Sequence, residues 1–300
     1  MKLKSILFAA LLLCFSRASA QEAGTAKTIV KADAIYYGAF VSENPIPSDT
    51  QIVASPLEPF RRYYTQGQIV YLNKGQSQGI KVGDLYQTLR SLGVFKHPFK
   101  KAKLGYYNEQ TGIIRIISVQ DTSATAEVYD TYNGVMLGDI VVPFQKLTPP
   151  EARPYGKFDP MAISTGKLTG QIVWARDSRE QLSTGDVVIV DVGERVGVKL
   201  GDYFTIYREQ GSDGILNYAD FEFGMRRSTG GSLRFRGSEF AIDRPVEGRD
   251  VLRRRYDSST MPRTNVGELV IIRVEGTTAT GVVVRTQGGE AFVGDKIELQ

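Results

Sequence analysis

Short apolar runs rich in β-branched residues recur along most of the chain, separated by glycines, and apolar positions with helical spacing are scarce. The clearest runs are residues 69–72, 113–119, 187–190 and 269–274. Their length and composition are typical of β-strands. A helix would absorb the intervening glycines at about 1 kcal/mol each, whereas tight turns use the positive φ that glycine reaches freely. The pattern therefore predicts an all-β protein.

Two blocks of this pattern occur twice, in the same order. The matching segments are 67–84 with 185–202, and 112–128 with 267–283. The first pair aligns without a gap at a distance of 118 residues, and all four of its glycines recur. Each copy closes on a Gly-Asp pair, at Gly138-Asp139 and at Gly294-Asp295. Self-similarity of this kind indicates a duplicated unit, so we expect two tandem copies of a small SH3-like or related β-barrel module.

The repeated glycines and aspartates predict structural turns. These turn residues are Gly75, Gly79, Gly83 and Asp84 in the first copy and Gly193, Gly197, Gly201 and Asp202 in the second. An aspartate after a turn glycine typically accepts hydrogen bonds from nearby backbone amides, and a shared calcium or ligand site is the alternative. The apolar residues between the glycines are expected to plug one end of each barrel; they are Ile80, Val82, Val198 and Leu200.

The chain divides into segments on this basis. They are a signal peptide at 1–20, a flexible segment at 21–32, a first β-barrel module at 33–146, a proline-rich linker at 147–164, and a second β-barrel module at 165–300 with a long insertion at about 209–263. Apolar stretches at 34–41 and 170–175 precede the repeated blocks in similar positions. We therefore expect each module to begin with an additional strand.

The first twenty residues have the organisation of a secretory signal peptide. Lys2 and Lys4 precede an apolar run at 6–15, and small residues at 18–20 form a cleavage site. Lipidation at Cys14 is the alternative. Loss of this segment lowers the formal net charge from +4 to +1 and removes the single cysteine. We therefore expect an exported protein of the periplasm or cell surface, without disulfides, without a transmembrane segment and without nucleic acid as its partner.

The segment from Gly67 to Asp84 reads Gly-x-x-Val-Tyr-Leu-Asn-x-Gly-x-x-x-Gly-Ile-x-x-Gly-Asp. This pattern resembles the paired β-modules of uncharacterised secreted bacterial proteins, which are often found beside LysM peptidoglycan-binding domains. It is similar, more loosely, to the C-terminal domain of flagellar assembly protein T. The resemblance covers roughly residues 33–146 and 165–300 and implies small β-modules, but it brings no catalytic or binding residues. A LysM segment is missing from this sequence, so a peptidoglycan role would rest on association alone.

Catalytic motifs are few. Residues 75–79 match the G-x-S-x-G nucleophile elbow around Ser77, but the second copy has Arg195 at that position and no helix is expected to follow. The single histidine, His97, lies among lysines and is expected to be a solvated loop residue. One histidine and no mature cysteine argue against a zinc site, and neither a P-loop nor a Rossmann fingerprint occurs. We therefore expect no cofactor and no metal.

The insertion is unusually rich in arginine. Residues 224–263 carry a formal charge of +5, with aromatic residues interleaved. Arginine with aromatics favours an anionic polymer or a protein interface, and a solvated loop is the alternative. The candidate partner-binding residues are Arg226, Arg227, Arg234, Arg236, Arg253, Arg254 and Arg255.

These features together favour a non-enzymatic, exported cell-envelope protein that acts in binding or assembly. Its partner would be another envelope protein or a cell-wall glycan, and its oligomeric state is open. The alternative function is a polysaccharide-acting hydrolase of the envelope with paired carboxylates. Asp220 and Glu222, with a distant partner, are candidates for that pair.

Overall fold

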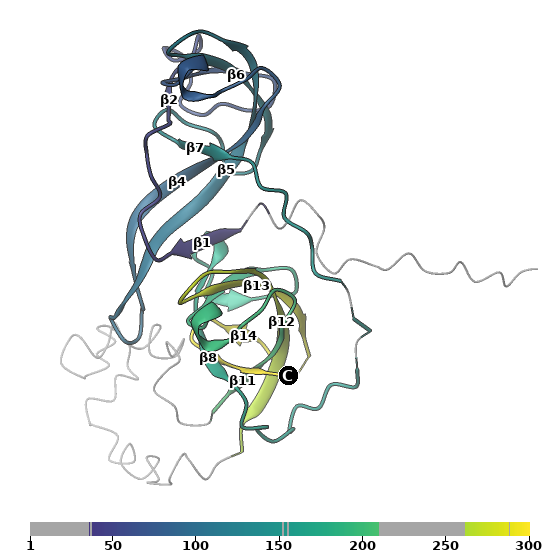
Figure 1. The fold of residues 1–300 in the computed structure, drawn as a ribbon. Helices are drawn as coiled ribbons and strands as arrows, with labels where there is room; N and C mark the ends of the chain where they lie inside the picture. Colours follow the sequence, from purple (N-terminus) through teal and green to yellow (C-terminus); the bar gives the residue numbers. More distant parts are fainter. Residues whose placement is uncertain (1–35, 37, 152, 155, 210–261, 288) are drawn as a thin grey trace, which may run out of the picture.

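The computed structural model describes residues 36, 38–151, 153–154, 156–209, 262–287 and 289–300 (Figure 1). The predicted signal peptide, the segment 21–32 and nearly all of the insertion lie outside the described residues. Within them, the prediction of an all-β protein is confirmed. The helical elements of the described residues are three short 3-10 turns: η2 (Gln76–Gln78), η3 (Arg176–Ser178) and η4 (Glu194–Val196).

The first module is a sheet of seven antiparallel strands. They are β1 (Ala39–Ser42), β2 (Ile52–Ala54), β3 (Ile69–Leu72), β4 (Leu85–Lys96), β5 (Lys103–Val119), β6 (Ala124–Thr131) and β7 (Ile140–Pro143). Their order is β2-β3-β6-β5-β4-β7, and β1 pairs with the first half of β5. A bridge between Gln51 and Ile140 joins the two outer strands, so the sheet curls into a barrel.

The second module contains a closed six-stranded barrel. Its strands are β8 (Thr169–Ala175), β10 (Val187–Val190), β11 (Tyr203–Arg208), β12 (Thr264–Val274), β13 (Ala279–Thr286) and β15 (Lys296–Leu299). They follow the order β10-β13-β12-β11-β15-β8 around the barrel. The short strands β9 (Gln181–Leu182) and β14 (Ala291–Phe292) pair with each other beside it.

The strand order of the first sheet matches that of the second barrel position by position, with β2 in the place of β8. Equivalent hydrogen bonds occur in the two modules: the amide of Ile52 donates to the carbonyl of Asp139 at 3.1 Å, and the amide of Ile172 donates to the carbonyl of Asp295 at 3.0 Å. The sequence suggested that the stretch 34–41 is the counterpart of 170–175. The structure shows that the counterpart is β2 instead. β1 is an extra strand, because it pairs with β5 outside the barrel.

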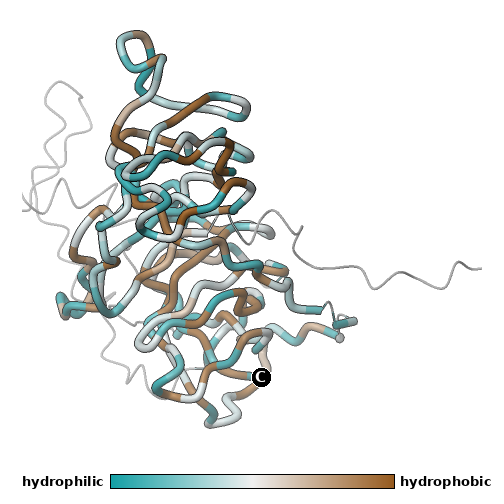
Figure 2. Tube along the Cα trace, turned by 45° about the horizontal axis from the view of Figure 1, so that its top comes forward, coloured by the Kyte–Doolittle hydropathy of each residue, from teal (hydrophilic) through white to brown (hydrophobic). Residues whose placement is uncertain are grey.

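Each barrel is filled mainly by aliphatic side chains, with Phe204 and Tyr64 also fully buried, and hydrophobic stretches recur along the chain in both modules (Figure 2). The prediction of the barrel plugs is half correct. Ile80 and Val198 are buried, at 4% and 3% exposure, but Val82 and Leu200 are 64% and 53% exposed. The reason is local: Val82 is the second residue of a tight turn closed by the amide of Asp84 on the carbonyl of Lys81, and this places its side chain outward.

The proline-rich segment after β7 lies against the second barrel. The guanidinium of Arg153 stacks 3.7 Å from the ring centroid of Tyr203. Further along, the carbonyl of Pro160 accepts a hydrogen bond from the amide of Asn265 at 2.8 Å, and the carbonyl of Gly156 accepts one from Arg285. The segment is thus part of the surface of the second module and does not act as a free spacer.

Candidate ligand-binding cleft between the modules

The two modules meet through β1 and through a hairpin arm, residues 90–109, in which β4 and β5 extend beyond the first barrel (Figure 1). β1 pairs with the arm on one side, with Ala39 opposite Glu109. On the other side its carbonyl groups accept hydrogen bonds from the second barrel: Thr280 donates to Ala39 at 2.9 Å and Thr278 donates to Val41 at 3.0 Å. One strand therefore holds both modules.

The tip of the hairpin arm is anchored by His97, which overturns the expectation of a solvated loop histidine. Its side chain is 2% exposed, and its Nε2 lies 3.2 Å from Oδ2 of Asp191 in the second module. Nδ1 accepts hydrogen bonds from the backbone amides of Phe99 and Lys100. Because Nδ1 is an acceptor, the ring proton lies on Nε2 and is donated to Asp191. His97 and Asp191 are 94 residues apart in the sequence, so no local sequence pattern predicts their contact.

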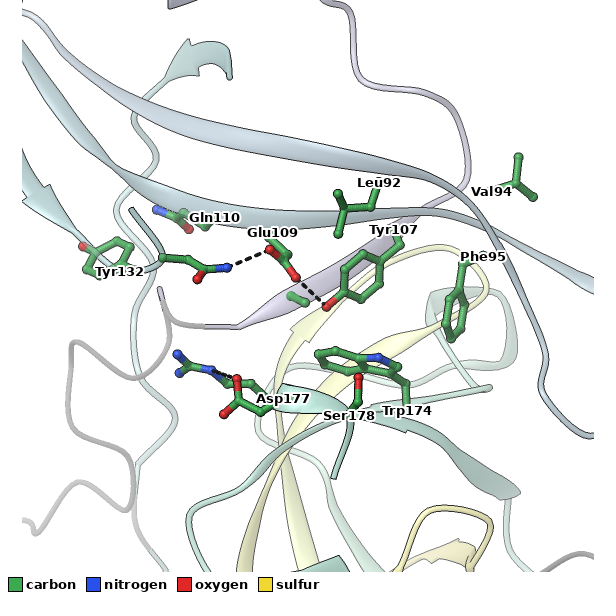
Figure 3. A pocket seen from close by; sticks show the side chains of 13 residues that line it. Leu92, Val94, Phe95, Tyr107, Glu109, Gln110, Tyr132, Trp174, Asp177 and Ser178 are labelled. Atoms are coloured by element: carbon green, nitrogen blue, oxygen red, sulfur yellow. Dashed lines mark hydrogen bonds and ion pairs between the residues drawn. The ribbon is translucent and has the colours of Figure 1, made fainter. Parts of the chain in front are cut away.

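A cavity of about 360 Å³ opens between the modules beside this junction (Figure 3). Its walls come from β1 and the hairpin arm on one side and from the end of β8 and η3 on the other. The lining residues are Ala39, Leu92, Val94, Phe95, Tyr107, Glu109, Gln110, Tyr132, Asn133, Trp174, Arg176, Asp177 and Ser178. We call this cavity the cleft.

One wall of the cleft is aromatic. Tyr107 of β5 and Trp174 of β8 meet edge to face, with ring centroids 5.0 Å apart and an angle of 61° between the planes. Phe95 lies 6.0 Å from Tyr107 on the other side. Trp174 is the only tryptophan of the chain and is half-buried, so one face of this wall is open to the cleft (Figure 3). The arrangement offers an apolar aromatic surface of fixed orientation.

The polar groups of the cleft are held in place by one another. Glu109 accepts hydrogen bonds from the hydroxyl of Tyr107 at 3.1 Å and from the side-chain amide of Asn133 at 2.7 Å (Figure 3). Burial, together with the negative charge of Glu109, raises the pKa of Tyr107 well above its ordinary value. The phenol therefore stays protonated at physiological pH and remains a donor to Glu109.

The rim of the cleft on the second module is conformationally strained. Asp177 and Ser178 have backbone φ angles of 60° and 54°. Residues other than glycine rarely adopt such angles. Arg176 lies 3.7 Å from Asp177. Strain of this kind costs of order 1–3 kcal/mol per residue and is concentrated at binding and catalytic sites. The strained loop after β8 therefore independently supports a functional role for the cleft.

The residues that the sequence singled out lie elsewhere. Ser77 is exposed in η2, where its hydroxyl donates to the carbonyl of Asp121 at 2.7 Å. The turn aspartates accept local amides: Asp84 accepts that of Lys81 at 3.0 Å, and Asp202 accepts that of Lys199 at 2.8 Å. Gly79 and Gly197 have φ of 86° and 89° at the ends of η2 and η4. None of these groups faces the cleft.

The arginine-rich surface falls outside the described residues, and its role stays a prediction. This holds for Arg226, Arg227, Arg234, Arg236, Arg253, Arg254 and Arg255, as well as for Asp220 and Glu222. The described part of the chain shows no group of three or more His, Cys, Asp or Glu side chains placed to hold a metal ion. A helix long and apolar enough to cross a membrane is likewise not found in that part.

The sequence did not point to the cleft, because its walls come from strands about 70 residues apart. The one available signal was the lone Trp174, which stands in an apolar strand and reads as core. No protein-family model and no curated protein sequence matches this chain.

Proposed function

We propose that this chain is a non-enzymatic, exported cell-envelope binding protein, built from two tandem copies of one β-barrel module, and that its cleft binds a segment of cell-wall glycan. The observation that carries the proposal is the aromatic wall of Tyr107 and Trp174 beside the hydrogen-bonding groups of Glu109 and Asn133. Ligand sites typically combine such apolar surface with a few placed polar groups.

A sugar ring fits this combination for a chemical reason. Its C–H groups form an apolar face that packs on an aromatic ring, while its hydroxyl groups both donate and accept hydrogen bonds. Glu109 accepts from a phenol and an amide, and carboxylate oxygens have further acceptor capacity for such hydroxyls. The guanidinium of Arg176 adds donors from the opposite wall.

The support of the cleft favours binding without large rearrangement. The arm is fixed at its tip by His97 and along its length by β1. Ala39, Val41 and Tyr107 are buried against Val173 and Ile189 of the second barrel. A preformed site avoids the entropy that a mobile site loses when it orders around a ligand.

Tryptophan fluorescence provides the test, because Trp174 is the chain's single tryptophan. The chain from Gln21 onward is titrated with soluble, size-fractionated cell-wall glycan fragments. Saturable quenching or a spectral shift is expected, and Glu109→Gln should weaken it at least tenfold. The matched control is Glu127→Gln, a half-buried carboxylate outside the cleft that is paired with Arg115 on the first barrel, and it should bind as the wild type does. Absence of saturable binding by the wild type would refute the glycan assignment.

A hydrolase remains the second candidate because two carboxylates, Glu109 and Asp177, line the cleft from opposite walls. Glycosidases use such a pair across the scissile bond. Binding is favoured because Glu109 is engaged by two donors and Asp177 is 64% exposed beside Arg176. The discriminating measurement is release of reducing ends from the same glycan fragments. Release that Glu109→Gln and Asp177→Asn each abolish would replace the binding proposal with the hydrolase.

A further inference from the structure

The first barrel has a pocket of its own, at the end from which the hairpin arm extends. It has a volume of about 430 Å³ and lies between the loop after β2 and the loop after β6. Arg90, the first residue of the arm, donates to the carbonyl of Gly134 in the second of these loops. We call it the arginine pocket. Its walls include Glu58, Phe60, Arg61, Arg62, Met136 and Leu137.

The guanidinium groups of Arg61 and Arg62 are available to a ligand. Both residues are exposed, and neither forms an ion pair with a carboxylate within the part of the chain that the structure describes. Among the described residues that line the pocket, Glu58 is the only acidic one, so two guanidinium groups stand against one carboxylate. Guanidinium groups bind carboxylate and phosphate oxygens through paired hydrogen bonds. The pocket therefore suits an anionic ligand.

The backbone that carries these arginines is fixed before any ligand binds. The amides of Phe60 and Arg61 both donate to the carbonyl of Leu57, at 2.9 and 3.0 Å, and Leu57 packs against the core of the first barrel. At the end of the turn, Tyr64 exchanges two backbone hydrogen bonds with Val135, at 2.8 and 3.1 Å. A preformed turn lowers the entropy lost on binding.

One loop lines both the cleft and the arginine pocket. Its residues 132–133 line the cleft, and its residues 136–137 line the arginine pocket. An extended chain advances at most about 3.6 Å per residue, so the two stretches come within about 11 Å of each other. Between them, the ring of Tyr63 packs so closely on Gly134 that a Cβ there would lie 2.8 Å from its Cδ1. A polymer that occupies the cleft can therefore reach the arginine pocket.

The duplication gives the arginine-bearing turn a counterpart that already belongs to the cleft. Tyr64 pairs with Val135 in the first module as Leu182 pairs with Ala291 in the second. The turn between β2 and Tyr64 therefore corresponds to the loop after β8, which carries Arg176 on the rim of the cleft. Each module thus presents arginine from the same loop of its barrel.

We propose that the glycan bound in the cleft carries carboxylate groups, and that one of them pairs with Arg61 and Arg62 in the arginine pocket. The assignment rests on the proposed glycan binding and adds the chemical class of the ligand and a second region of contact. A single carboxylate neutralises the charge that the two arginines leave after Glu58. The ring of Phe60, 83% exposed at the edge of the pocket, offers an apolar face to a sugar ring.

The test compares charged and neutral forms of one ligand, with the fluorescence of Trp174 as the readout. Soluble cell-wall glycan fragments that carry carboxylates are titrated as such and after conversion of the carboxylates to methylamides. The chain from Gln21 onward should bind the charged form about tenfold more tightly, and added salt should reduce that difference. The variant with both Arg61→Gln and Arg62→Gln should bind the charged form about tenfold more weakly than the wild type and the amidated form equally well.

A matched control removes the same charge at the other end of the first barrel. Lys74→Gln with Lys81→Gln changes the segments around η2, whose backbone bonds to residues 120–121 just before β6, whereas the arginine pocket lies beyond the end of β6. This variant should bind both forms of the fragments as the wild type does. Circular dichroism and thermal unfolding establish that both double variants fold, which substitutions at the surface allow.

The outcomes separate this proposal from glycan binding in the cleft. A wild type that binds both forms equally, with the arginine variant unchanged, overturns the proposal but leaves the cleft as a glycan site, where Glu109→Gln should weaken both forms. An equal loss of both forms in the arginine variant also overturns it, because it would show only a structural role. A wild type that binds neither form refutes both ideas. Binding to vesicles of phosphatidylglycerol and phosphatidylethanolamine that is lost in the arginine variant would assign the pocket to a membrane surface instead.

Discussion

Arg90 holds Asp139 in a bidentate ion pair, with Nε and one terminal nitrogen each 3.0 Å from a carboxylate oxygen, and Arg208 holds Asp295 in the same way at 2.9 Å. In both modules the aspartate also accepts the amide three residues before it, and the arginine also donates to a backbone carbonyl. One side chain therefore links the last strand of each barrel, the turn before it and the strand that carries the arginine.

Removing the arginine should be costly, because the carboxylate is 2% exposed or less. We expect Arg90→Leu and Arg208→Leu each to lower the free energy of unfolding by about 3–5 kcal/mol, the usual effect of leaving a buried charge unpaired. Chemical denaturation measures this. Arg115→Leu, which removes a surface pair with Glu127, is the control and should cost less than about 1 kcal/mol. Equal losses in all three variants would contradict the argument.

Glu298 should make the second module sensitive to acid. Burial by itself raises the pKa of Glu298, but hydrogen bonds from Ser164 and Arg263 outweigh it and hold the pKa below its usual value. A carboxyl whose folded pKa is depressed stabilises the fold above its unfolded pKa of about 4.3, and this contribution disappears as pH falls through the folded pKa.

Glu298→Gln tests this directly. The variant should be less stable than the wild type near neutral pH, and the difference should shrink as pH falls below about 4. Thermal unfolding across that range measures both chains. A constant difference between wild type and Glu298→Gln at every pH would show that the charge of Glu298 contributes nothing.

The His97–Asp191 contact should couple the two modules energetically. We expect His97→Ala and Asp191→Ala each to lower stability by about 1–3 kcal/mol, because each leaves a buried polar partner without its hydrogen bond. The double variant should lose less than the sum, with a coupling energy of about 0.5–3 kcal/mol. Lys100→Ala removes an exposed partner of the same carboxylate and is the control, with little effect expected. Strict additivity would place the two residues in independent roles.

Two neighbouring glycines should respond differently to a single methyl group. A Cβ on Gly193 would lie 2.3 Å from the carbonyl oxygen of Glu275, whereas a Cβ on Gly197 would meet nothing within 4 Å. Gly197→Ala should therefore cost about 1 kcal/mol, from its φ of 89° alone, and Gly193→Ala should cost more because backbone has to move. Unfolding of the two variants under identical conditions compares their losses of stability. A larger loss for Gly197→Ala than for Gly193→Ala would contradict the steric argument.

Local geometry was predictable from the sequence, because it depends on residues close together in the chain. The glycine spacing at 75, 79 and 83 predicted turns, and the β-branched runs predicted strands. The outward position of Val82 was missed, because an apolar residue in a turn resembles a core residue when only hydrophobicity is considered. The additional strand expected from the stretch 34–41 exists as β1, but its equivalence with 170–175 was wrong, because β1 is apolar where it packs on the second barrel.

The cleft and the junction could not be predicted from the chain. Tyr107 and Trp174 come together only because the arm extends past its own barrel, and neither residue lies in a motif. His97 looked solvated among lysines, although Lys100 turns toward the same Asp191 that His97 contacts. Contacts of this kind depend on how two completed barrels pack, and such packing leaves no periodicity in either one.

β5 belongs to two structures at once. Its second half is a wall of the first barrel, and its first half carries Tyr107 and Glu109 into the cleft. The strand is continuous over 17 residues, so the first barrel cannot unfold without removing that wall of the cleft. Occupancy and folding are consequently linked equilibria: any ligand held by Tyr107 and Glu109 protects the first barrel from unfolding, by an amount that grows with the logarithm of its concentration.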